Sequence, residues 1–222
     1  MLAVDKPRAL RTIAMWAEFL TTGAGRRNHI EFHDLDQFMQ YRVLDVGKMY
    51  WVGVLTFGMA IDIPDHEMDL CSELCHAAWL SCGLINDLYS WPKERKAAVD
   101  SGASHVNNAV WVLMRQHGID EPAAIARLKD RIRSCMAQHL VVVEQCKHRT
   151  NISLQLRRFV EAMEYSMVAN VVFSGECPRY NYQRGFNERQ LGWMKGGTPS
   201  EPGIMGRAET QERMVCRSEG WL

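Results

Sequence analysis

Three oxygen-bearing side chains recur at four-residue intervals in the stretch LINDLYSWPKE, which spans Leu84 to Glu94. They are Asn86, Ser90 and Glu94, and this spacing places them in one row on the face of an α-helix. An amide carbonyl, a hydroxyl and a carboxylate are hard ligands of the kind that Mg²⁺ prefers. With a single carboxylate among the ligands, the bound ion stays positive toward phosphate, and Lys93 adds a cation at the same end of the row. The row therefore predicts a Mg²⁺ site that faces a phosphate group.

A solvated helix face is the alternative interpretation of the same row. The apolar run AAWLSCGLI leads directly into it, and polar groups so close to a packed segment need partners. This setting favours a binding site. Pro92 is expected to bend the helix, because it cannot donate a hydrogen bond to the Leu88 carbonyl.

The nonapeptide NDLYSWPKE resembles the second metal-binding motif of class I terpene cyclases, which is often called the NSE triad. Upstream, QYRVLDVG is similar to the segment in which these enzymes carry a diphosphate-sensing arginine, a linker and an effector. By that resemblance Arg42 is the sensor and Asp45 the linker, and the effector is Gly47 or the preceding Val46.

Downstream, FSGECPRYN resembles the arginine–tyrosine pair that closes these sites, which implies Arg179 and Tyr180. The three motifs stand in the order that the family uses. NDLYSWPKE and CPRY together are most similar to the fungal branch, which includes cyclase domains fused to a prenyltransferase.

A class I cyclase ionises an isoprenyl diphosphate and cyclises the carbocation. The resemblance implies Mg²⁺ as cofactor and geranylgeranyl or geranylfarnesyl diphosphate as substrate, with farnesyl diphosphate left open. It implies that the diphosphate is bound by Arg42, Asn86, Lys93, Arg179 and Tyr180. Aromatic side chains could line the cavity without acting as nucleophiles, although ordinary core is the favoured interpretation for each of them. The candidates are Trp51, Phe57, Trp79, Trp111 and Phe173.

The family also carries an aspartate-rich motif on an earlier helix, and this sequence has no Asp-Asp dipeptide. The nearest substitutes are Asp62, Asp65 and Asp69. Asp65 is expected about 30 Å from Asn86 on one continuous helix, which is too far to share a metal cluster. We therefore expect an N-terminally truncated cyclase that resembles the family over residues 5–185. A catalytically inactive module of the same fold and an unrelated helical bundle are the alternatives.

Helical periodicity dominates the chain, which predicts an all-α class I terpenoid synthase bundle without its leading helices. Residues 1–190 are expected to form the partial cyclase domain and residues 191–222 a disordered tail or linker stub. The third predicted helix has Asp65 as its N-cap, and the polar stretch AVDSGASH is expected to link it to the next. The expected helices are 8–22, 35–59 with a break near Gly47, 65–94 or beyond, 107–116, 122–148 and 154–173.

Equal numbers of basic and acidic residues, 26 of each, argue against nucleic-acid binding and against attraction to acidic lipid. The first residues lack a signal-peptide core and the longest apolar stretch is too short to span a bilayer, so we expect a cytoplasmic protein without stable membrane insertion. The seven cysteines are expected as reduced thiols. Exposed apolar faces on a truncated bundle predict a homo-oligomer or a separate prenyltransferase partner.

Overall fold

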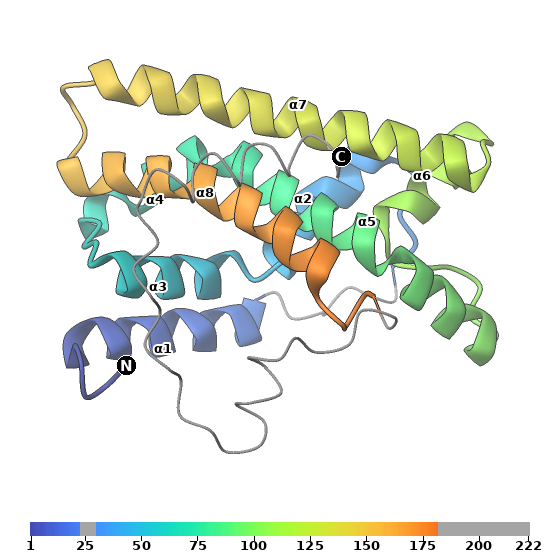
Figure 1. Cartoon of the computed structure of the whole chain (residues 1–222), viewed down its shortest axis with the longest axis horizontal. Helices are drawn as coiled ribbons and strands as arrows, with labels where there is room; N and C mark the ends of the chain where they lie inside the picture. The colour runs from blue at the N-terminus through green and yellow to red at the C-terminus, as the bar shows by residue number, and fades with distance from the viewer. Residues whose placement is uncertain (23–29, 182–222) are drawn as a thin grey trace. The chain divides into compact units, whose positions relative to one another are not determined.

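The computed structural model describes residues 1–22 and 30–181, and every regular element within them is a helix. The predicted all-α class is therefore confirmed. Figure 1 shows the elements in chain order. They are α1 (Lys6–Thr22), α2 (Leu35–Asp45), α3 (Lys48–Met59), the 3₁₀-helix η1 (Asp65–Glu67), α4 (Met68–Leu74), α5 (His76–Ser101), α6 (Ala109–His117), α7 (Glu121–His148) and α8 (Leu154–Glu176).

The chain divides into two compact units, Met1–Met167 and Val168–Leu222. Helices α1 to α7 and most of α8 belong to the first unit. The end of α8 and residues 177–181 belong to the second. The predicted tail, residues 191–222, lies outside the described residues, as does the predicted domain boundary at residue 190.

Local signals in the sequence set the ends of several helices. The side chains of Asp34, Asn108 and Asp120 cap α2, α6 and α7 by accepting hydrogen bonds from backbone N–H groups in the first turn. Gly102 and Gly118 end α5 and α6 in the left-handed conformation. These caps explain why most predicted boundaries lie within a few residues of the observed ones.

The predicted break near Gly47 is confirmed. Helix α2 ends at Asp45 and α3 begins at Lys48, and Gly47 between them has φ +83°. A residue with a side chain rarely adopts this conformation, so glycine lets the chain change direction here. The Val46 N–H donates to the Arg42 carbonyl and closes the last turn of α2.

The predicted single helix over residues 65–94 is wrong. Asp65 to Glu67 form η1, and the chain breaks again at Cys75 between α4 and α5. Asp65 is not an N-cap, because its carboxylate pairs with Arg11 of α1 instead. The link expected over AVDSGASH begins later than predicted, because α5 continues to Ser101 and Gly102 is its C-cap.

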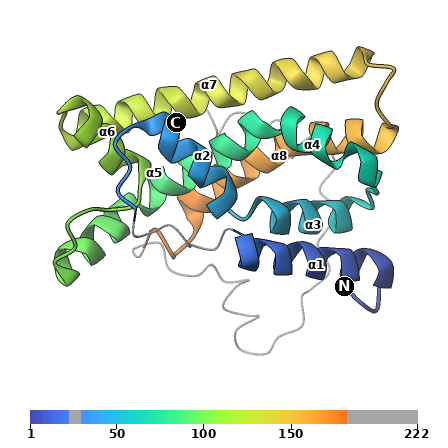
Figure 2. The same cartoon turned by 180° about the vertical axis from the view of Figure 1, so that it is seen from behind.

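Helix α5 is central to the first unit and contacts α2, α4, α6 and α7 (Figure 1). Helix α7 lies along α5 and α6, and α1 lies beside α3, which is clear again from behind in Figure 2. The α1–α3 approach is close because Gly53 has no side chain: a Cβ there would lie 2.9 Å from the Thr12 Cα. The Thr12 hydroxyl donates to the Gly53 carbonyl at 2.8 Å.

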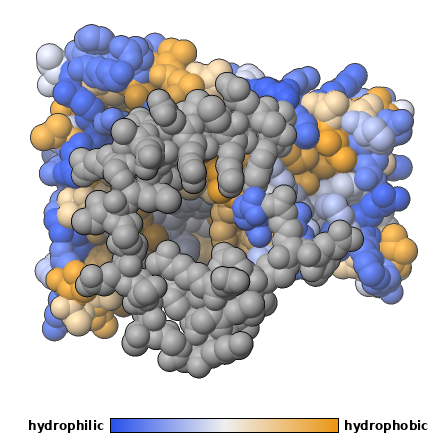
Figure 3. All heavy atoms as spheres, viewed as in Figure 1, coloured by the Kyte–Doolittle hydropathy of each residue, from blue (hydrophilic) through white to orange (hydrophobic). Residues whose placement is uncertain are grey.

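The described residues visible on the face in Figure 3 include both hydrophilic and hydrophobic areas. Helix α1 carries four large apolar side chains that are about half exposed, namely Leu10, Ile13, Trp16 and Leu20. Trp16 contacts Tyr50 of α3 with their ring centroids 5.8 Å apart.

No helix in residues 1–22 or 30–181 has both the length and the apolar character needed to cross a membrane.

Candidate functional site

The three predicted metal ligands all lie on α5, as the four-residue spacing requires. Asn86 and Glu94 are partly exposed, whereas Ser90 is only 3% exposed. The Ser90 hydroxyl has no hydrogen-bond partner among the described residues. Lys93 is exposed at the same end of the row. Pro92 lies inside α5 without ending it; the predicted bend stays a prediction.

Arg42 of α2 connects the predicted sensor segment to this row. Its Nη2 donates to the Asn86 Oδ1 at 2.7 Å, and its Nη1 donates to the Asp45 Oδ2 at 2.6 Å. The structure thus brings together three residues that the sequence separates by up to 44 positions. Gly83 permits this approach, because a Cβ at that position would lie 3.1 Å from the Arg42 Cγ.

Asp87 is a buried carboxylate beside the row. Its Oδ1 accepts from the Arg42 Nε at 2.8 Å and its Oδ2 accepts from the Ala109 N–H at 3.1 Å. Burial raises the pKa of Asp87 to about 6, against the opposing effect of the Arg42 charge. Burial alone would lower the pKa of Arg42, but the Asp87 and Asp45 carboxylates outweigh it and raise that pKa above its usual value. Arg42 therefore stays charged.

Asn108, the residue that caps α6, lies against the other end of the row. Its Nδ2 is 2.9 Å from the Glu94 Oε2 and 2.9 Å from the Asp87 carbonyl oxygen. Sequence reasoning assigned a role to neither Asp87 nor Asn108. An asparagine directly before the apolar run AVWVL is typical of an N-cap, but nothing in the local pattern reveals its contact with Glu94.

Gly47 and Val46, the alternative effectors, lie at the α2–α3 break one turn beyond Arg42. A hollow of about 470 Å³ lies next to this break, and it is lined by Glu18, Phe19, Thr22, Leu44, Lys48 and Met49. None of the five predicted cavity aromatics lines it. Trp79 is fully buried and packs against Trp51 and Phe159, with ring centroids 6.4 Å away in both cases. Trp79 is therefore core.

Arg179 and Tyr180 follow α8 in the second unit. The guanidinium carbon of Arg179 lies 5.7 Å from the centroid of the Tyr180 ring, which is cation–π distance. The Asn181 side chain donates to the Gly175 carbonyl at 2.9 Å and helps to end α8. The part of these two residues in closing a site near Asn86 stays a prediction.

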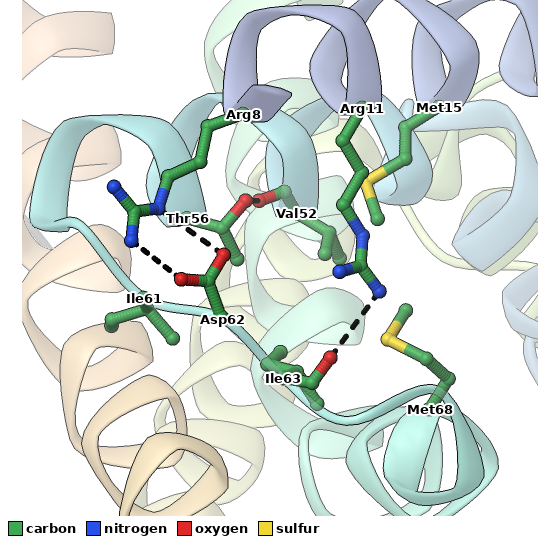
Figure 4. Close-up of a pocket in the computed structure, with 9 residues that line it drawn as sticks. All are labelled: Arg8, Arg11, Met15, Val52, Thr56, Ile61, Asp62, Ile63 and Met68. Atoms are coloured by element: carbon green, nitrogen blue, oxygen red, sulfur yellow. Dashed lines mark hydrogen bonds and ion pairs between the residues drawn. The ribbon is translucent and has the colours of Figure 1, made fainter. Parts of the chain in front are cut away.

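Two of the three acidic residues considered as substitutes for an aspartate-rich motif pair with arginines. Asp62 pairs with Arg8 and Asp65 pairs with Arg11, and both arginines come from α1 and line a small surface pocket. Figure 4 shows Arg8 directed at Asp62, and Arg11 directed at the Ile63 carbonyl. Over the described ranges, no three His, Cys, Asp or Glu side chains are grouped closely enough to hold a metal ion.

Comparison with known proteins identifies the family. A family model described as "Terpene synthase family 2, C-terminal metal binding" matches residues 3–138. The chain is 46% identical to fusicoccadiene synthase of Phomopsis amygdali over 200 aligned residues. The aligned region covers 90% of this chain and 28% of that protein. It is 39% identical over 202 residues to a bifunctional type I diterpene synthase of Aspergillus flavipes, covering 91% of this chain and 26% of the relative.

A bifunctional sesterterpene synthase of Aspergillus aculeatus is 41% identical over 210 residues, which is 93% of this chain and 29% of that protein. The chain thus spans under a third of the length of each of these relatives. The predicted resemblance to fungal bifunctional enzymes is confirmed. The metal-binding family model, the fungal relatives and the all-helical fold together show that this chain belongs to the terpene synthase family.

Proposed function

We propose that this chain carries the metal- and diphosphate-binding part of a class I terpene cyclase, which ionises an isoprenyl diphosphate with Mg²⁺ and cyclises the resulting carbocation. One observation carries the proposal. The Ser90 hydroxyl is buried without a protein partner among the described residues, in a row with an amide oxygen and a carboxylate. Leaving such a group unpaired costs about 1–3 kcal/mol, and a bound ligand would remove that cost.

The donor set fits a hard cation. Asn86, Ser90 and Glu94 would hold Mg²⁺ through three oxygen atoms on one helix face. When bound, the ion supplies positive charge that stabilises the leaving diphosphate. Because Asn86 already accepts a hydrogen bond from Arg42, the guanidinium lies beside the first of the three ligands.

The chain's own cations would bind the diphosphate oxygens. Arg42 is already oriented by its contacts with Asp45, Asn86 and Asp87, so diphosphate would bind the N–H donors that these contacts leave. Lys93 is exposed and can move toward the leaving group. Arg179 and Tyr180 are proposed as further donors, and Gly47 or Val46 as the effector that follows Arg42.

The relatives indicate the substrate class. Their names describe diterpene and sesterterpene synthases, which favours geranylgeranyl or geranylfarnesyl diphosphate for this chain. Two of these relatives are named bifunctional, and a prenyltransferase partner that would supply the substrate stays a prediction.

Ser90→Ala tests the proposal, with Ser81→Ala as its matched control. Both serines are buried on α5, but the Ser81 hydroxyl donates to the Ala78 carbonyl at 2.8 Å. Ser90→Ala should weaken Mg²⁺-dependent binding of inorganic diphosphate at least about tenfold in calorimetric titration, with unfolding free energy unchanged or higher. Ser81→Ala should lose about 1 kcal/mol of unfolding free energy and bind normally.

Release of diphosphate from geranylgeranyl diphosphate then tests turnover. Mg²⁺-dependent release that disappears in Ser90→Ala supports the cyclase. Binding without release identifies the inactive module of the same fold, and equal diphosphate binding by wild type and Ser90→Ala rejects the metal row itself.

A further inference from the structure

Asn108 is fully buried, and the structure gives each of its side-chain polar groups a partner. Its Nδ2 donates to the Glu94 Oε2 at 2.9 Å and to the Asp87 carbonyl at 2.9 Å. Its Oδ1 accepts from the Val110 N–H at 2.8 Å and caps α6. An amide has two N–H donors and one carbonyl acceptor, so each type of group is matched here. One side chain therefore joins the start of α6 to two points on α5.

The two acceptors on α5 lie on the same face. Asp87 and Glu94 are seven residues apart, and seven residues make almost two full turns of an α-helix. The Asp87 backbone carbonyl and the carboxylate of the long Glu94 side chain both lie 2.9 Å from the Asn108 Nδ2, so a single amide bridges them. Pro92 lies between them and cannot donate a backbone hydrogen bond, so the contact from Asn108 adds a tether to a part of α5 that has one helical hydrogen bond fewer.

Glu94 is the only one of the three proposed ligands that carries a charge, and it has the longest side chain. An uncharged donor such as Asn108 can orient its carboxylate and leave the negative charge available to a cation. A lysine or arginine in that place would compete with the cation. The neighbouring Arg95 does not take that place, because it pairs with Glu121 of α7.

We propose that Asn108 is a positioning residue for the metal site: its amide holds the Glu94 carboxylate in the orientation that binds the divalent cation. This inference rests on the proposed function, because it requires that Glu94 is a ligand. Hydrogen-bond partners of metal ligands of this kind typically change metal affinity by about 10–100-fold when they are removed.

Asn108→Ser tests the two roles of Asn108 separately, because it keeps the cap of α6 and removes the amide N–H donors. Serine caps a helix about as well as asparagine, but its hydroxyl is too short to span the Asp87 carbonyl and Glu94. Mn²⁺ prefers oxygen ligands as Mg²⁺ does, and its binding to the full chain is measured directly by electron paramagnetic resonance. We expect Asn108→Ser to weaken Mn²⁺ binding about 10–100-fold. It should also lower the thermal midpoint without unfolding the chain, because the buried Asp87 carbonyl loses a donor.

Asp120→Ser is the matched control, because it replaces the cap of α7 in the same way and lies outside the row. It should leave Mn²⁺ binding unchanged. Asn108→Thr, a second substitution that keeps a capping hydroxyl, should behave like Asn108→Ser. If both Asn108 variants unfold although they keep a capping hydroxyl, the amide contacts serve the fold and the positioning role is rejected.

The double variant Glu94→Gln/Asn108→Ser tests whether the effect passes through Glu94. Against a Glu94→Gln background, Asn108→Ser should change Mn²⁺ affinity less than about twofold, because the carboxylate it orients is gone. Equal weakening in both backgrounds overturns the positioning role. If Glu94→Gln weakens Mn²⁺ binding and Asn108→Ser does not, the inference is wrong and the proposed function stands. If Glu94→Gln has no effect, both are wrong.

Discussion

The Arg42 guanidinium and the Asp87 carboxylate form a buried ion pair that joins α2 to α5. Nε and Nη2 lie 2.8 and 2.7 Å from the Asp87 Oδ1, and the two side chains are 11% and 1% exposed. The same guanidinium reaches Asn86, the first proposed metal ligand. The proposed diphosphate sensor is thus held by a carboxylate directly next in sequence to a ligand, so damage to this pair should affect both stability and binding.

Arg42→Met should be strongly destabilising. It leaves the Asp87 carboxylate buried without its cation, and breaking such a pair typically costs about 3–5 kcal/mol. Urea unfolding at pH 8 measures the loss. The double variant Arg42→Met/Asp87→Asn should regain part of it, because the uncompensated charge is removed. Lys96→Met is the control, since it breaks an exposed pair with Asp100 and should have little effect. A small loss in Arg42→Met would show that the pair is not structural.

Gly83→Ala should fail to stabilise α5. Alanine normally favours a helix over glycine by about 1 kcal/mol, but here its Cβ would lie 3.1 Å from the Arg42 Cγ. Arg42 is held by Asp45, Asn86 and Asp87, so it cannot move away without weakening those contacts. We expect no gain in thermal midpoint and weaker diphosphate binding.

Gly58→Ala is the matched comparison for Gly83→Ala, because Gly58 lies in α3 with nothing within 4 Å of an added Cβ. It should gain up to about 1 kcal/mol of unfolding free energy. Equal gains in the two variants would mean that Arg42 can shift freely.

His139 should make the protein less stable in acid. Burial lowers the pKa of this α7 histidine below its usual value of 6.5, although its Nε2 lies 2.9 Å from the Val160 carbonyl. The unfolded chain therefore binds this proton more readily than the native state. The resulting contribution to unfolding free energy is complete above about pH 6.5 and falls as the pH drops below it, by at most about 1.4 kcal/mol per pH unit.

His139→Gln removes this titration and keeps a donor for the Val160 carbonyl. Urea unfolding between pH 5 and 7 should show a shallower dependence in this variant than in the wild type. His148→Gln, at a position 81% exposed near the end of α7, should leave the dependence unchanged. A slope in His139→Gln as steep as in the wild type would assign the acid effect to other groups.

The sequence alone determined the features that depend on near neighbours in the chain. The Asn86–Ser90–Glu94 row follows from helical spacing, and the break at Gly47 follows from a glycine placed between two helical segments. The caps at Asn108 and Asp120 were not predicted, but they are equally local, since each side chain accepts a hydrogen bond from a backbone N–H two or three residues away. The family motifs could be recognised for the same reason, because each is a short run of neighbouring residues.

Only the tertiary structure decided which distant side chains meet. Asp65 suits a helix cap by its type, yet it pairs with Arg11, 54 residues earlier. Arg42 meets Asp87 over 45 positions and Asn108 meets Glu94 over 14. Such pairings depend on how α1, α2 and α6 pack against the rest of the bundle. The hydrophobic periodicity of one helix does not specify which residue of another helix will contact it.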